Sequence, residues 1–165
     1  MGSKKGIGIT VAILVGVIAA SFLVYLIPEN NDMKLFVSDF EKNLDGIDER
    51  TSMLSTGIEK SFEELINHKL SPEEYFVTAG VTQSQVNSLI IELTLSGAPQ
   101  EWAASYKSYI DVLKKLNEQI TETVVVANLM NDGNNSKSIN EIISKIYELR
   151  TESLTLIEKS DNLRP

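Results

Sequence analysis

The 165-residue sequence contains no cysteine and a single histidine, His68. Without cysteine the chain has no disulfide, no thiolate metal ligand, no thiol nucleophile and no lipoprotein cysteine anchor. One histidine cannot build the paired Glu-x-x-His motifs of a di-metal helical bundle, and zinc hydrolysis lacks ligands too. We expect His68 at a helix end, where a cation suits the helix dipole. A glycine-rich phosphate loop is also missing. The sequence therefore predicts a protein that is not an enzyme and that uses no cofactor and no metal.

Charge is missing from one long stretch, residues 6–27, which reads GIGITVAILVGVIAASFLVYLI. As a helix it would reach about 33 Å, enough to cross a hydrocarbon core of about 30 Å. Lys4 and Lys5 precede it and acidic residues follow it, so the positive-inside rule predicts a cytoplasmic N-terminus. The sequence thus predicts a signal anchor, a single-pass transmembrane helix in the cell membrane, with the C-terminal domain extracytoplasmic.

Two other interpretations of this stretch stay open. Ala19, Ala20 and Ser21 offer the small residues of a signal-peptide cleavage site, although the apolar stretch is longer than a usual signal peptide has. The run Lys4-Lys5-Gly6 resembles a prepilin-peptidase site, but the glutamate expected near its start is absent and a pilin head is largely strand. A pilin-like surface protein is therefore a lesser alternative. In every case the following domain is exported.

The exported part is acidic. Residues 29–165 hold 13 basic and 23 acidic side chains, a net charge of −10. Such a domain repels phosphate backbones, so we expect no nucleic-acid partner. The expected organisation is a cytoplasmic N-terminus (1–5), a transmembrane helix (6–27), a joint (28–31), a helical bundle (32–160) and a C-terminal tail (161–165).

Apolar residues predict the first two helices of the bundle. The first is expected from a cap at Asp32 to about Lys69, with Thr51 filling a gap in a heptad stripe. That stripe contains Phe36, Phe40, Leu44, Ile47, Leu54, Ile58, Phe62 and Leu65. The second starts at the Ser71-Pro72 cap. Its apolar positions are Phe76, Ala79, Val86, Leu89, Ile90 and Leu93. Gly80 could interrupt it, with Thr82 and Gln85 restarting it as a capping box, but the unbroken apolar phase favours one helix.

The segment Ser96-Gly97-Ala98-Pro99 ends the second helix and opens the third. The stripe of the third is Trp102, Tyr106, Tyr109, Leu113, Leu116, Ile120, Val124, Ala127 and Met130. Residues 131–135 form a turn by composition. The fourth helix is expected over residues 138–159, with Glu141 and Lys145 as an ion pair on its wet face. The predicted fold is all-α, an up-down-up-down antiparallel four-helix bundle. A long coiled coil between chains is the alternative, which the three local turns disfavour.

Trp102, Tyr106 and Tyr109 share one helix face and are the candidate ligand-binding or partner-binding residues. We favour their packing as core against Leu89, Ile90 and Leu93; the functional alternative is a ligand cavity or a partner anchor. Asn134, in Asn134-Asn135-Ser136, matches the N-glycosylation pattern in the predicted distal turn.

An anchored helical bundle resembles in layout the sensor domains of chemoreceptors and histidine kinases. Those continue into a second membrane helix and a cytoplasmic signalling module, which this sequence lacks, so we expect a tether. The leading hypothesis is a non-enzymatic interaction module: an accessory subunit, scaffold or assembly factor of a membrane or envelope complex. The expected partners are the membrane, which the chain spans, and a second protein. The alternative is a sensor-like bundle that binds a small ligand. A homo-oligomer formed through the membrane helix or the bundle is a further possibility.

Overall fold

The structure is a computed structural model that describes residues 37–132 and 136–165. The chain divides into two units, residues 1–33 and residues 34–165, and everything described belongs to the second. The predicted transmembrane helix (6–27), the joint (28–31), Asp32, Phe36 and Asn134 lie outside the described residues. Within the part that is described, none of the helices combines the length and the apolar character needed to cross a bilayer.

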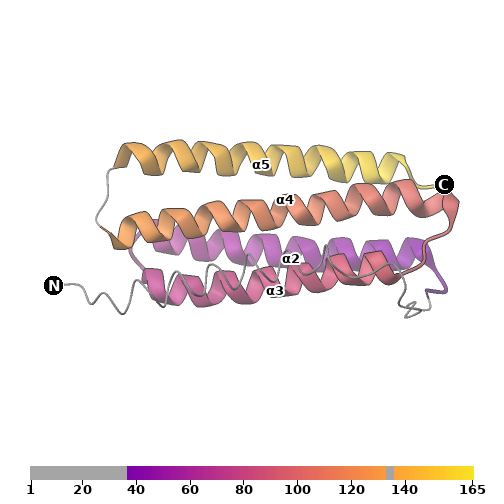
Figure 1. The fold of residues 1–165 in the computed structure, drawn as a ribbon, viewed down its shortest axis with the longest axis horizontal. Coiled ribbons are helices and arrows are strands. Elements are labelled where there is room, and N and C mark those ends of the chain that lie inside the picture. Colours follow the sequence, from indigo (N-terminus) through magenta and orange to yellow (C-terminus); the bar gives the residue numbers. More distant parts are fainter. Residues whose placement is uncertain (1–36, 133–135) are drawn as a thin grey trace. The chain divides into compact units, whose positions relative to one another are not determined.

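Four helices make up the described unit: α2 (Phe40–Ile66), α3 (Pro72–Leu95), α4 (Gln100–Asn131) and α5 (Ser136–Asn162). Successive helices run in opposite directions, as the colours in Figure 1 show. The predicted all-helical four-helix bundle is confirmed, and residues 37–132 and 136–165 include no strand. The start of α2 and the C-terminus lie at the same end, where Arg164 donates to the Asp45 carboxylate at 2.6 Å.

The first helix begins later than predicted. Residues 37–39 are not helical, and Asp39 is the N-cap, with its carboxylate accepting from the Lys42 backbone N–H at 3.0 Å. A start near Asp32 is therefore wrong for the helix that carries the heptad stripe. The physical reason is local: Asp39 supplies an acceptor for an otherwise unpaired N–H of the first turn, directly before Phe40.

The end of α2 is a Schellman motif around His68. The His68 N–H donates to the Leu65 carbonyl at 2.9 Å, and the Lys69 N–H donates to the Glu64 carbonyl at 2.8 Å. This places His68 in the left-handed region, with φ 55°, a position that glycine usually occupies. His68 is exposed just past the helix end, which agrees with its predicted location.

The predicted start of α3 is confirmed. Ser71 caps the helix, Pro72 follows, and Ser71 and Glu74 form a reciprocal capping box through contacts of 3.0 and 3.3 Å. The helix runs without interruption through Gly80 to Leu95. The second capping box does not form, because the Thr82 hydroxyl donates to the Thr78 carbonyl at 2.9 Å within the continuous helix.

The predicted heptad stripe of α2 supplies four buried core residues, Leu44, Ile47, Ile58 and Leu65. Thr51 does fill the gap, and it is buried with its hydroxyl donating to the Ile47 carbonyl at 2.7 Å.

In α3 the expectation for Phe76 was wrong, because Tyr75 is the fully buried residue and Phe76 is only half-buried. The seam through Tyr75, Ala79, Thr82 and Val86 keeps the alternating spacing of four and three, whereas Phe76 lies outside it.

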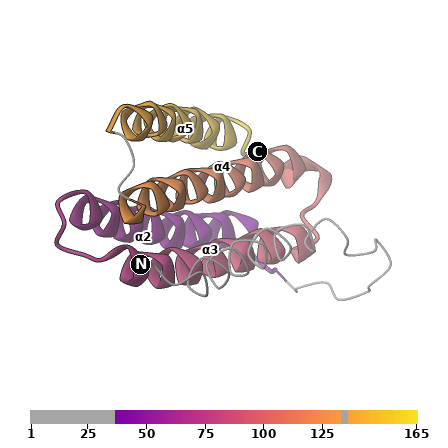
Figure 2. The same ribbon diagram turned by 60° about the vertical axis from the view of Figure 1, so that its left-hand side comes forward.

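Helix α4 is central because it packs against each of the other three, and α5 packs mainly along α4 (Figure 2). Ser105 of α4 and Ser160 of α5 are both fully buried and exchange hydrogen bonds: the Ser105 hydroxyl donates to the Ser160 carbonyl at 2.8 Å and the Ser160 hydroxyl to the Ser105 carbonyl at 3.0 Å. Such small residues let two helix backbones approach closely. Helices α2, α3 and α4 also contact one another. Helices α2 and α5 therefore share α4 as a neighbour.

Candidate functional site

An elongated hollow lies between α2 and α5, with α4 as its floor. It consists of two cavities, of about 70 and 320 Å³, that share Glu59, Gln119 and Arg150 in their linings. We call the two together the α2–α5 groove. Along α2 its lining runs from Asp48 to Glu63, which at about 1.5 Å per residue corresponds to roughly 22 Å, or four helical turns.

The floor of the groove is apolar and so is much of the α5 wall. Val112, Leu116 and Ile120 of α4 form the floor and are buried. On the α5 wall, Tyr147 and Leu154 also line the groove, yet their exposed fractions are 61% and 56%. These two residues are seven apart and therefore lie on the same face of α5. The groove thus offers an apolar strip that the residues described by the structure do not cover.

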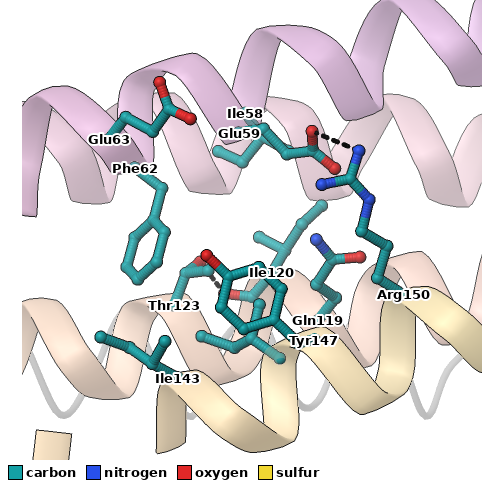
Figure 3. A pocket seen from close by; sticks show the side chains of 11 residues that line it. Ile58, Glu59, Phe62, Glu63, Gln119, Ile120, Thr123, Ile143, Tyr147 and Arg150 are labelled. Atoms are coloured by element: carbon teal, nitrogen blue, oxygen red, sulfur yellow. Dashed lines mark hydrogen bonds and ion pairs between the residues drawn. The ribbon is translucent and has the colours of Figure 1, made fainter. Parts of the chain in front are cut away.

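The middle of the groove is polar. Arg150 of α5 reaches across to α2, with its Nη2 3.2 Å from the Glu59 carboxylate (Figure 3). The Ser55 hydroxyl donates to the same carboxylate at 3.4 Å. Gln119 of α4 lines both cavities and is only 5% exposed, and its amide has no hydrogen-bond partner within residues 37–132 and 136–165. Figure 3 shows Gln119 and Arg150 both extending toward α2.

The lining of the groove carries a net negative charge. Asp48, Glu59 and Glu63 on α2 face a single basic residue, Arg150, on α5. Asp48 accepts a hydrogen bond from the Tyr109 hydroxyl at 2.5 Å, and Glu59 pairs with Arg150. Glu63 forms no ion pair with any residue that the structure describes, so the acidic character is strongest on the α2 side.

The sequence-predicted aromatic residues lie elsewhere on α4. Tyr106 and Tyr109 are buried, and the Tyr106 hydroxyl shares its proton between the Phe40 carbonyl and the Asn43 side-chain oxygen, both at 2.9 Å. Trp102 is half-buried and meets Tyr106 edge-on, with ring centroids 6.3 Å apart. Neither cavity of the groove includes any of the three. The observed polar contacts of Tyr106 and Tyr109 go to α2, and their packing against Leu89, Ile90 and Leu93 of α3 stays a prediction.

Burial controls the ionisation of the tyrosines in the core. It raises the pKa of Tyr106 to about 12. For Tyr109, burial and the hydrogen bond to Asp48 both raise the pKa well above the usual value of 10, and burial raises the pKa of Tyr75 despite its hydrogen bond to Thr123. All three side chains are therefore neutral phenols at physiological pH, and they act as hydrogen-bond donors to acceptors held on other helices.

The sequence does contain a signal for the groove, in a second stripe that runs along α4 beside the predicted one. Its spacings are three, four, seven, four and three residues, and its members are Ser105, Ser108, Val112, Gln119, Thr123 and Val126, all buried. Because several are polar, a search for apolar periodicity passes over them. A helix with two adjacent buried stripes needs neighbours on more than one side, which is what α4 has.

In the described part of the chain, no group of three or more His, Cys, Asp or Glu side chains could hold a metal ion. The predicted ion pair between Glu141 and Lys145 is also replaced, because Lys145 pairs with Glu122 of α4 at 2.6 Å. Comparison of the chain with protein-family models, with curated proteins and with solved structures gave no match.

Proposed function

We propose that the protein is a membrane-anchored, extracytoplasmic docking module without enzymatic activity, which serves as an accessory subunit, scaffold or assembly factor of a membrane or envelope complex. The observation that carries the proposal is the α2–α5 groove, with its apolar floor and the exposed Tyr147 and Leu154 on its wall. Exposed apolar side chains that gather beside a groove are typical of surfaces that bind another molecule.

The dimensions of the groove favour a helix as the docked element. Its lining spans four turns of α2, and Ile143, Tyr147, Leu154 and Ile157 recur along α5 at spacings of four, seven and three residues. Helix-in-groove recognition uses such a surface, because an incoming helix places its own apolar residues at the same spacing. A helix in this position would lie against α2, α4 and α5 together.

The apolar segment at residues 6–27 supports the proposal as the expected tether. A docking domain held at a membrane meets membrane-bound partners at a raised effective concentration, so a modest intrinsic affinity is sufficient. A pilin-like protein gains no support from the all-helical fold of the described residues, since a pilin head is largely strand.

Co-purification of the full-length chain from native membranes in mild detergent tests the proposal. Leu154→Gln places a polar side chain of similar length on the groove wall. Val77→Gln makes a comparable change on α3, outside the groove lining, where Val77 is 69% exposed. We expect Leu154→Gln to reduce recovery of a partner at least tenfold and Val77→Gln to leave it unchanged. A chain that purifies strictly alone, or two variants that lose the partner equally, would overturn the proposal.

A small-ligand-binding bundle is the second candidate, and the 320 Å³ cavity favours it, because ligand sites begin at about 300 Å³. In this case the ligand would lie beside Thr51, Gln119 and Ser153 and not beside Trp102 and Tyr106. A thermal-shift screen of the wild-type chain and of Gln119→Leu tests it. A compound that stabilises the wild type alone would support this candidate, and a screen without hits would exclude it for the compounds tested.

A further inference from the structure

One polar side chain on the floor of the α2–α5 groove makes no hydrogen bond to the residues that the structure describes. Gln119 lies between Leu116 and Ile120 on the floor of the groove. The residue is only 5% exposed, its amide borders both cavities, and the amide has no hydrogen-bond partner among the residues that the structure describes. An amide in this state is only partly solvated and is less favourable than one that is hydrogen-bonded. An occupant of the groove that brings its own polar group would remove this cost.

Arg150 stands next to this amide as a second point of polar recognition. Its guanidinium carries five N–H donors, and the 3.2 Å contact with Glu59 occupies only one side of it. The contact also holds the side chain across the groove, pointing from α5 toward α2 (Figure 3). Gln119, Glu59 and Arg150 together form a polar cluster across the middle of the groove, and we call these three residues the girdle.

Charge indicates which occupant fits. Asp48, Glu59 and Glu63 make the α2 side of the groove acidic, and Glu63 has no ion pair in the described part of the chain. A second copy of this chain would bring another acidic domain, since residues 29–165 carry a net charge of −10. An anionic lipid surface would also be repelled. A basic segment is attracted to this side.

The exposed residues indicate the size of the occupant. A small molecule held in the 320 Å³ cavity would leave Tyr147 outside, because this side chain lines only the smaller cavity. A helix that lies along the whole groove covers Tyr147, Leu154 and the girdle at once. Helix docking therefore accounts for the exposed apolar residues and for the unpaired amide together.

We propose that the groove receives a basic amphipathic helix of a partner protein, with one amide or hydroxyl side chain inside its apolar stripe that pairs with Gln119. This inference rests on the proposed docking function and specifies its partner. The girdle fixes the register of the docked helix, because any shift along the groove would bury Gln119 against an apolar residue. A single buried polar pair acts in this way in coiled coils, where it selects register and partner at a cost in stability.

Site-specific photo-crosslinking in native membranes tests the proposal. A benzophenone amino acid replaces Tyr147 in the full-length chain, and in a second variant it replaces Val77 on α3 as the matched control. Crosslinked peptides are sequenced by mass spectrometry. We expect an adduct from position 147 only, with a peptide that has apolar residues at spacings of three and four, a net positive charge, and one Asn, Gln, Ser or Thr within that stripe.

Four further substitutions in the crosslinking chain test the recognition chemistry. Gln119→Leu should lower the adduct yield at least threefold, and Gln119→Met serves as a second variant of similar length. Glu63→Gln should lower the yield and flatten its dependence on salt, because it removes the unpaired acid of the α2 wall. Glu141→Gln, an exposed acid on α5 outside the groove lining, should do neither.

The outcomes separate this inference from the docking function itself. Absence of any protein adduct from position 147 would overturn both. An adduct with an acidic or non-helical peptide, or unchanged yields with Gln119→Leu and Gln119→Met, would overturn the inference while leaving a docking module. An adduct with this chain itself would replace the partner by a second copy, and a lipid or small-molecule adduct would exclude the helix.

Discussion

Replacing Gln119 by leucine should stabilise the domain. The substitution removes a buried amide that has no hydrogen-bond partner among the described residues and adds apolar surface between Leu116 and Ile120. An unpaired buried amide costs about 1–3 kcal/mol, and access to the cavity reduces this figure. We therefore expect the free energy of unfolding to rise by about 1 kcal/mol, which corresponds to an increase in Tm of about 3–5 °C for a domain of this size.

The chain contains a matched control in Gln83, which is 7% exposed on α3. Its side-chain N–H donates to the Thr121 hydroxyl at 3.0 Å, so Gln83→Leu loses a hydrogen bond worth about 1 kcal/mol while gaining a similar apolar contribution. The expected change in unfolding free energy is within about 0.5 kcal/mol of zero.

Thermal and urea unfolding of both variants, followed by circular dichroism of the full-length chain in detergent, measure this difference. If Gln119→Leu lowers Tm by several degrees while Gln83→Leu does not, the Gln119 amide has a structural role and the argument for its function fails. If Gln119→Leu raises Tm and also weakens partner capture, the residue is maintained for binding at the expense of stability.

Three further predictions follow from the helix ends and the core. Ser71→Ala should lower the unfolding free energy by about 1 kcal/mol, because it removes the N-cap of α3; a loss below about 0.3 kcal/mol in urea unfolding would contradict the role of the cap. His68→Gly should raise it by about 0.5–1 kcal/mol, because glycine adopts the observed φ of 55° without strain, whereas His68→Ala should bring no gain. Burial raises the pKa of Tyr106 from 10 to about 12, so the folded state favours the neutral phenol. The resulting stabilisation is complete below about pH 10 and is lost as the pH rises through about 12; a Tm that stays constant from about pH 8 to 12 would refute it.

Local chemistry made the number and order of the helices predictable. The Ser71-Pro72 start and the stop at residues 96–99 depend on neighbouring residues alone, so they could be identified without knowledge of the tertiary structure. The heptad stripe of α2 was equally informative, because Thr51 occupies a position that a strict apolar search would have left empty. In these cases the sequence pattern and the packing follow the same period.

Choices between adjacent residues were harder. Tyr75 and Phe76 are neighbouring aromatics, and apolarity favours phenylalanine. The seam that meets α4 selects Tyr75, whose hydroxyl donates to Thr123 at 2.5 Å. Similarly, Asp32 and Asp39 are both good N-caps, and only the backbone beyond the cap shows that Asp39 is the residue used for α2. Such choices depend on residues that are far away in the sequence.

The groove could not be predicted, because it depends on how completely four helices close around one another. A closed bundle and an open one share the same turns and nearly the same apolar stripes. The difference lies in the polar residues of the second α4 stripe, especially Gln119, whose environment is set by the separation of α2 and α5. Arg150 and Glu59 would have been assigned to solvent by any helical projection of their own helices.

The attachment of α5 to essentially one neighbour has a consequence for how the domain opens. Its described buried residues, Ile146, Leu149 and Ser160, serve a helix that packs mainly on α4, whereas α2, α3 and α4 support one another. Detachment of α5 breaks that interface and two ion pairs to α2, Arg150 with Glu59 and Arg164 with Asp45, so its amides should exchange with deuterium sooner than those of α4. A released α5 could also settle on the α4 of another copy, where Ser160 would find an equivalent Ser105. The α4–α5 interface, which forms within one chain, would then form between two chains and give a domain-swapped dimer.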